Sequence, residues 1–147
     1  MYATLTFVLN LLATWYMVGL IWMVQIVHYN LFDRVGQEGF VRYEADHGRL
    51  ITPIVGVPML IEIVTAALLL ANAPAGFPKW AAWLGMAMVV ALWMSTAFLQ
   101  VPYHNQLMQG FDQAAYQKLV NTNWIRTFLW TARGFLMGWF LLKLLDS

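Results

Sequence analysis

Four long apolar stretches alternate with polar segments along the chain. They run from about Leu5 to Leu31, from Ile51 to Ala71, from Trp80 to Val101 and from about Trp124 to Leu142. Each has the roughly 20 residues that a helix needs to cross the hydrocarbon core of a bilayer. The pattern therefore predicts an all-α fold, in which residues 1–147 form a single transmembrane domain built as a four-helix bundle.

The three connecting segments differ in length and charge. Residues 72–79 are short and rich in proline and glycine, which is typical of a tight hairpin. Asp33–Leu50 and Pro102–Thr122 are long and hold most of the charge. Each long connector also contains an apolar stripe at helical spacing, which predicts a helix lying in the membrane interface. The two stripes are Phe32, Val35, Phe40 and Tyr43, and Leu107, Phe111, Ala115 and Leu119.

With four spans, both long connectors lie on the same side of the membrane. Basic residues are more frequent on that side, where they are Arg34, Arg42, Arg49 and Lys118, than on the other, where they are Lys79 and Lys143. The positive-inside rule then places the long connectors in the cytoplasm and both termini outside. We expect the membrane to be a bacterial inner membrane.

The two halves of the chain show a weak internal repeat. Gln25 and the run His28-Tyr29-Asn30 match Gln100 and the run Tyr103-His104-Asn105, and further matches follow at offsets of 71 to 75 residues. A duplication would relate two helix hairpins by a pseudo-two-fold axis along the membrane normal. Chance similarity in so biased a composition is the alternative.

Composition excludes several classes of protein. Only 10% of the residues are charged and 61% are hydrophobic, whereas a soluble domain carries about 25% charged residues. The net charge of +1 provides no basic surface for nucleic acid. The absence of cysteine rules out disulfides, thiolate metal sites and cysteine nucleophiles. The expected partner is the lipid bilayer, and a homo-oligomer or a larger membrane complex is left open.

Two charged residues lie deep within the predicted spans. Glu62 and Arg133 are each about 11 residues from the long-connector side, so both fall near the bilayer midplane. A lone charge there costs at least about 2.5–3.5 kcal/mol on insertion scales. We therefore predict a buried Glu62–Arg133 ion pair. It would clamp two helices together, or alternatively serve a substrate or proton pathway.

All three histidines fall near the long-connector face, although they come from different segments. Interfacial histidines without a specific role are one interpretation. In a second, His28, His47 and His104 ligate a metal ion with an open position. In a third, His28 and His104 are axial ligands of a haem b held within the bundle.

Other polar residues gather at the same level. Arg126 could hold an anionic substrate group, and together with Asn123, His28 and His104 it forms the candidate catalytic set. Glu44 and Asp46 are further candidate general bases. The residues expected to orient a polar ring substituent are Gln25, Gln100, Asn105 and Trp130.

One segment resembles a known family. Val101-Pro102-Tyr103-His104-Asn105-Gln106-Leu107, followed by Asn123-Trp124-Ile125-Arg126-Thr127 at the start of the fourth span, is similar to small four-span membrane proteins of the anthrone-oxygenase type. The matching positions are Pro102, Asn105, Leu107, Asn123, Arg126 and Thr127. The resemblance implies oxygenation of a flat, electron-rich phenolic ring at the membrane without an obvious cofactor. His104 beside Asn105, together with His28 and His47, departs from that pattern and leaves room for a metal or haem variant.

The sequence therefore leads to one main functional hypothesis. The protein is expected to be a small membrane oxidoreductase or oxygenase that acts on a lipophilic aromatic or quinone-like molecule, with or without a histidine-bound metal ion or haem. The alternative is a small transporter, or a non-catalytic accessory subunit of a larger membrane complex.

Overall fold

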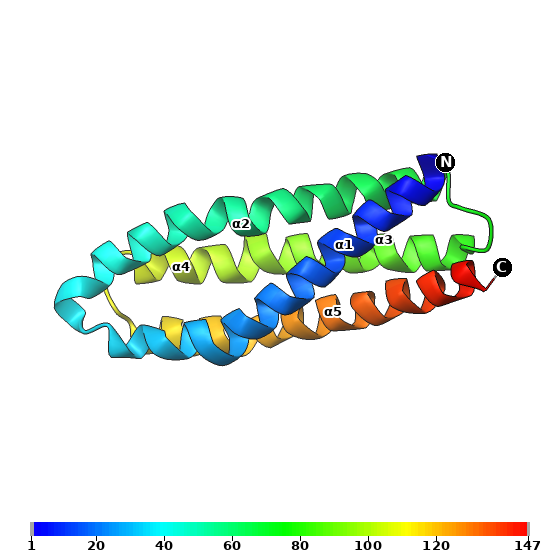
Figure 1. Cartoon of the computed structure of the whole chain (residues 1–147). Coiled ribbons are helices and arrows are strands. Elements are labelled where there is room, and N and C mark those ends of the chain that lie inside the picture. Colours follow the sequence, from blue (N-terminus) through cyan, green and yellow to red (C-terminus); the bar gives the residue numbers. More distant parts are fainter. Residues whose placement is uncertain (1, 147) are drawn as a thin grey trace.

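The computed structural model describes residues 2–146, which form a bundle of four long helical segments (Figure 1). The first segment is α1 (Tyr2–Met23), continued by a π-helical turn (Val24–His28) and a 3₁₀ stretch (Tyr29–Arg34). The second is α2 (Gln37–Ala71). The third is α3 (Lys79–Ser95), continued by a π-helical turn (Thr96–Gln100) and α4 (Val101–Leu107), and the fourth is α5 (Gln113–Leu145). The described residues contain no strand, so the predicted all-α four-helix bundle is confirmed.

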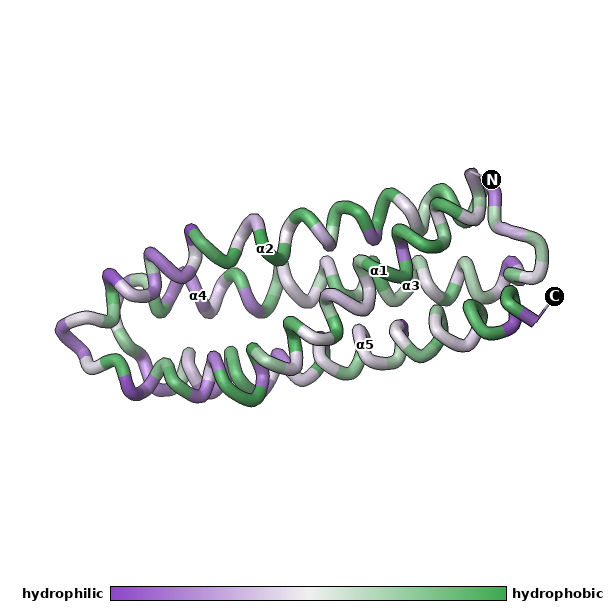
Figure 2. The backbone as a smooth tube through the Cα atoms, viewed as in Figure 1, coloured by the Kyte–Doolittle hydropathy of each residue, from purple (hydrophilic) through white to green (hydrophobic). Residues whose placement is uncertain are grey.

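All four segments are long and apolar enough to cross a membrane. Large apolar side chains on their outer faces are exposed, including Leu60, Trp83, Phe128 and Phe135, as expected of helices surrounded by lipid. Figure 2 shows that hydrophilic positions gather at the end of the bundle opposite the two termini. The structure thus supports an integral membrane protein with one polar end.

The helices are arranged in a ring. α1 packs against α2 and α5, and α3 packs against the same two helices. Both termini lie at one end of the bundle, and the connections that follow Arg34 and Leu107 lie at the other (Figure 1). We call this second end the connector end.

The expected long connectors are helical instead. α2 begins at Gln37 and α5 begins at Gln113, so residues 35–36 and 108–112 are all that separates the helices there. Gly36, at a φ of 80°, makes the first of these tight connections, because its lack of a side chain permits this left-handed region.

The expectation of separate interfacial helices is therefore wrong. The two apolar stripes lie on extensions of the membrane-spanning helices, where Phe32, Phe40, Leu107 and Leu119 are fully buried in one core cluster. The stripes pack against each other inside the bundle, which shields them from water as effectively as a lipid interface would.

The third span is predicted from the sequence to end at Val101, directly before Pro102, but the helix does not end there. The helix continues to Leu107, and the π-helical turn Thr96–Gln100 lies directly before the proline. A proline lacks an N–H and clashes with the preceding helical turn, and a π-turn is a place where the regular hydrogen-bonding ladder is already interrupted. The other π-turn, Val24–His28, lies in the first helix of the other hairpin. The two turns begin at residues 24 and 96, an offset within the range of the sequence repeat.

The bundle is taller than a bilayer core. α2 has 35 residues, which at 1.5 Å per residue is about 52 Å, compared with about 30 Å of hydrocarbon. Measured from its end at Ala71, Glu62 lies at about 14 Å and His47 at about 36 Å. With the edge of the hydrocarbon at Ala71, the bilayer midplane would fall near Glu62, and His47 would lie at headgroup level.

Candidate functional site

A cavity of about 410 Å³ lies inside the bundle towards the connector end. Most of its wall is apolar and includes Met17, Ile21, Val55, Met59 and Trp93. Its polar wall residues include Tyr29, Glu44, His47, Gln100, His104, Asn105 and Arg126. An apolar pocket with a few convergent polar groups is the usual form of a small-molecule site.

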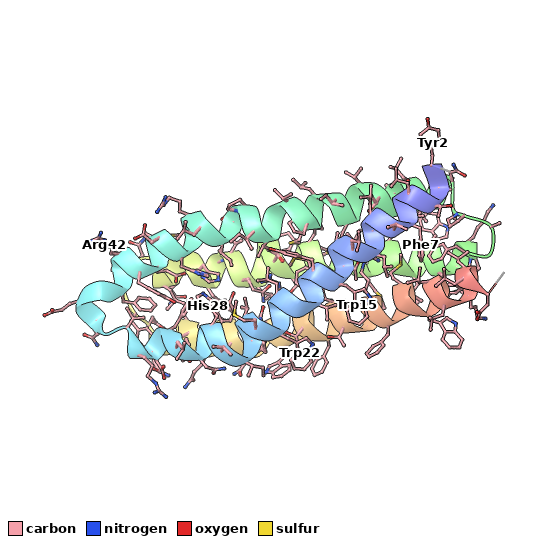
Figure 3. The ribbon with its side chains drawn as sticks, viewed as in Figure 1. Tyr2, Phe7, Trp15, Trp22, His28 and Arg42 are labelled. Atoms are coloured by element: carbon pink, nitrogen blue, oxygen red, sulfur yellow. The ribbon has the colours of Figure 1, made fainter. Side chains whose placement is uncertain are left out.

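The structure brings the three histidines together. His28 Nε2 lies 2.9 Å from His47 Nδ1, and the rings of His47 and His104 pack with centroids 5.1 Å apart. Figure 3 shows His28 toward the interior of the bundle, whereas Arg42 points away from it. The chain His28–His47–His104 thus joins three separate helical segments at one level.

Glu44 adds a buried carboxylate to this cluster. Its Oε1 is hydrogen-bonded to His104 Nδ1, and the residue is only 1% exposed. On its other side, the His104 ring is held by the Tyr29 hydroxyl, 2.9 Å from Nε2. A carboxylate and a tyrosine therefore fix the orientation of this imidazole.

Four buried polar atoms in residues of the cavity wall have no hydrogen-bond partner among residues 2–146. Trp93 Nε1 is on the apolar wall, and the other three are Glu44 Oε2, His47 Nε2 and Arg126 Nε. Because nearly all buried polar groups in proteins are satisfied, these unsatisfied atoms around one cavity indicate that the cavity receives a polar ligand, an ion or water.

Glu44, His47 and His104 also form a potential metal-binding group, with one ligand atom from each within 4.8 Å of the others. The sequence had suggested His28 in place of Glu44. In the structure, His28 is the hydrogen-bond partner of His47. The His47 ring also packs against both other histidines, so a haem ligated by His28 and His104 would have to displace it. The arrangement fits a compact ion better than a haem.

Sequence reasoning named Glu44 only as a candidate base, although a signal for a shared site was present. Glu44 and His47 are three residues apart, and this Glu-x-x-His spacing places both side chains on one face of a helix. The same spacing supplies ligands in carboxylate-bridged metal sites of four-helix bundles. The spacing matters only on a helix, and the sequence had assigned this stretch to a connector.

Three other predicted site residues lie away from the cavity wall. Gln25 and Asn123 hydrogen-bond each other, with Asn123 Nδ2 donating to Gln25 Oε1 over 2.9 Å. Gln25 also donates to the Val120 carbonyl, so the pair joins the first segment to α5. Trp130 is fully buried and donates to Glu62. None of the three lines the cavity. Neighbouring helices use most of their polar groups, although Asn123 Oδ1 is buried without a partner among the described residues. Their contacts with a substrate stay a prediction.

Gln100 and Asn105, which were also predicted to contact a substrate, both line the cavity but differ in whether their side chains have hydrogen-bond partners. The Gln100 side chain is engaged with Ser95 and Thr122. Asn105 lines the wall with no side-chain partner among residues 2–146. Asn105 is thus the freer of the two amides to contact a ligand.

Glu62 and Arg133, which the sequence placed at one depth, form an ion pair. Arg133 Nε lies 3.2 Å from Glu62 Oε1, and both residues are 1% exposed. The remaining guanidinium donors bind the Gly85 carbonyl and Asn10 Oδ1, each over 2.6 Å. Glu62 also accepts hydrogen bonds from Thr14 and Trp130.

We call these residues the midplane cluster: Asn10, Thr14, Glu62, Gly85, Trp130 and Arg133. It joins all four helices of the ring, and its charged groups are fully engaged, which favours a structural role.

A second hollow, of about 320 Å³, lies between the first segment and α2. His28 and His47 form part of its wall, together with the exposed residues Met23, Asp46 and Ile54. His47 lines both this hollow and the main cavity. The hydrogen-bonded pair of His28 and His47 therefore stands between this hollow and the main cavity.

Comparison of the chain with protein-family models, with curated proteins and with solved structures finds no match.

Proposed function

We propose that the protein is a small integral membrane oxygenase that acts on a lipophilic aromatic molecule in the main cavity. The observation that carries the proposal is the set of three unpartnered buried atoms, Glu44 Oε2, His47 Nε2 and Arg126 Nε, at the polar end of an otherwise apolar cavity. The resemblance to anthrone-oxygenase-type proteins supports the same chemistry.

The apolar wall suits a flat ring. Met17, Ile21, Met59 and Trp93 offer methyl, thioether and indole surfaces, and binding there removes the ring from water or lipid. A phenolic or carbonyl oxygen on that ring would then meet Arg126, whose Nε donor is free. This orientation presents the reactive edge of the ring to the histidines.

His47 is placed to act as the general base. When its Nδ1–H donates to His28 Nε2, its Nε2 lone pair faces the cavity and can accept a proton. Loss of a proton from the ring leaves an electron-rich anion, whose negative oxygen Arg126 stabilises.

Such an anion reacts with dioxygen. Overall, a ring methylene and O₂ give a ring carbonyl and water: one oxygen atom enters the product, and the other leaves with the two methylene hydrogens. Dioxygen accepts all four electrons, so this reaction needs no further reductant.

The test uses anthrone as the probe and the purified protein in lipid nanodiscs. We expect oxygen uptake with one O₂ consumed per anthrone, and a loss of about 10²–10⁴-fold in rate for His47→Ala, which is the usual contribution of a general base. Glu38→Gln is the matched control, because Glu38 lies on the same helix as His47 but is exposed and lines neither the cavity nor the second hollow.

Two outcomes would overturn the proposal. If the protein binds anthrone, seen as a change in tryptophan fluorescence, and consumes no oxygen, the cavity belongs to a carrier. If it neither binds nor oxidises the probe and co-purifies with a membrane complex, it is an accessory subunit.

A further inference from the structure

Two histidines and one carboxylate converge at the polar end of the cavity, and they come from two helical segments. Glu44 and His47 lie on α2, and His104 lies on α4. One ligand atom from each lies within 4.8 Å of the others. Around a tetrahedral ion with ligands at about 2.1 Å, the ligand atoms lie about 3.4 Å from one another. The three ligand atoms would therefore have to move closer by up to about 1.4 Å to share one ion.

Two of the three residues have a free donor atom for an ion, and the third, His104, would exchange its Nδ1 hydrogen bond to Glu44 Oε1 for the ion. Glu44 Oε2 and His47 Nε2 are buried without any hydrogen-bond partner, in residues that are only 1% and 8% exposed. Both residues line the cavity. An unpaired carboxylate oxygen is costly in such a place, and a cation would satisfy it and the imidazole lone pair together.

Outer contacts orient the ligands. His28 Nε2 lies 2.9 Å from His47 Nδ1, so a proton on Nδ1 leaves the lone pair on Nε2 for the ion. Tyr29 holds His104 through Nε2 and leaves Nδ1 facing Glu44. Metal-ligating histidines nearly always have such a partner on their second ring nitrogen.

We propose that Glu44, His47 and His104 bind one divalent first-row transition-metal ion, with His28 and Tyr29 as the residues that position the two imidazoles. Two imidazoles and one carboxylate, without thiolate, form the donor set typical of non-haem Fe²⁺ sites that leave coordination positions open. Here the open positions face the cavity.

The proposed ion and the proposed general base compete for His47 Nε2, because a lone pair that binds an ion cannot accept a proton. In the absence of the ion, His47 remains available as the base. Metal binding can be measured without turnover, and the failure of one proposal is therefore distinguishable from the failure of the other.

The experiment is a titration of chelator-treated protein in detergent with Co²⁺, followed by visible absorption and calorimetry. We expect one Co²⁺ per chain with visible d–d bands. Glu44→Gln, His47→Ala and His104→Ala should each abolish stoichiometric binding. His28→Ala, which removes only the orienting contact, should weaken it about 10–100-fold.

Glu38→Gln is the matched control and should bind Co²⁺ as the wild type does, because this carboxylate of the same helix is exposed and lines neither the cavity nor the second hollow. Circular dichroism of each variant separates lost binding from lost folding. The proposal is overturned if folded wild-type protein binds no Co²⁺ at one per chain, or if Glu44→Gln or His47→Ala binds it unchanged.

Discussion

The Tyr29 hydroxyl lies 2.9 Å from His104 Nε2, and these two residues are 75 positions apart, at matching places in the two halves of the chain. The contact joins the first helical segment of one hairpin to that of the other. It also completes a row in which the His104 ring is held between a tyrosine and Glu44. Tyr29 and His104 are equivalent positions in the weak sequence repeat, so this hydrogen bond joins two equivalent positions of the two hairpins.

Removing this hydroxyl should loosen the junction between the hairpins. We expect Tyr29→Phe to lower the free energy of unfolding by about 1 kcal/mol, the net value of a typical hydrogen bond. Tyr103→Phe is the control, because the Tyr103 hydroxyl has no partner among residues 2–146. Thermal unfolding in detergent measures both, and equal effects of the two variants would contradict a specific Tyr29–His104 bond.

The ion pair between Glu62 and Arg133 should matter for stability mainly because each charge neutralises the other. Glu62→Gln leaves the buried Arg133 guanidinium without its counter-charge, and we expect a loss of about 3–5 kcal/mol. The double variant Glu62→Leu/Arg133→Met removes both charges and should recover part of that loss. Recovery is incomplete because Asn10 and Trp130 also lose a partner. Unchanged unfolding of Glu62→Gln in detergent would show that the pair carries no stability.

Gly85 allows the closest approach in the midplane cluster. A Cβ at this position would lie 2.9 Å from Arg133 Nη1, the nitrogen that donates to the Gly85 carbonyl. We expect Gly85→Ala to destabilise the fold by about 1–3 kcal/mol through overpacking. Gly19→Ala, at a helical position with nothing within 4 Å of the added Cβ, is the matched control and should leave the melting temperature unchanged or slightly higher.

Arg126 should discriminate ligands by charge. It is buried, stacks 5.2 Å from the Trp130 ring centroid, and keeps one free donor at the cavity. A charge-assisted hydrogen bond contributes about 1.5–3 kcal/mol, so Arg126→Gln should weaken binding of an ionised phenol about 10–100-fold. The methyl ether of the same phenol, which cannot ionise, should bind both proteins alike. The measurement is a fluorescence titration of both proteins with the two compounds. If Arg126→Gln loses the same affinity for the ether as for the phenol, Arg126 has a purely structural role.

The number of helices and the pairing of Glu62 with Arg133 followed from the sequence, because hydrocarbon imposes a minimum length of apolar residues and makes a charge within a span conspicuous. The start of α2 did not follow. Apolar composition marks only the part of a helix that lies in hydrocarbon, and the charged residues from Glu38 to Arg49 look like a loop although they continue the helix. Glu44 was therefore separated from the histidines it contacts.

The sequence pattern also could not predict the directions in which the side chains of Gln25 and His28 point. Gln25 and His28 are three residues apart, and in a regular helix they would share a face. The π-helical turn Val24–His28 widens the helix between them. As a result Gln25 hydrogen-bonds α5, whereas His28 hydrogen-bonds α2. A prediction that assumes 3.6 residues per turn throughout the helix cannot foresee that Gln25 and His28 face different helices.

The height of the bundle has a consequence for kinetics. With the histidines at headgroup level, the hydrophobic ligand of the proposed reaction would reach His47 from the lipid phase, and a small polar reactant would arrive from water. The concentration that governs binding of the hydrophobic ligand is then its mole fraction in the surrounding lipid. Adding empty lipid at a constant total amount of ligand lowers this mole fraction and should slow the reaction. Adding water does not change the mole fraction, so the rate per protein molecule should stay the same.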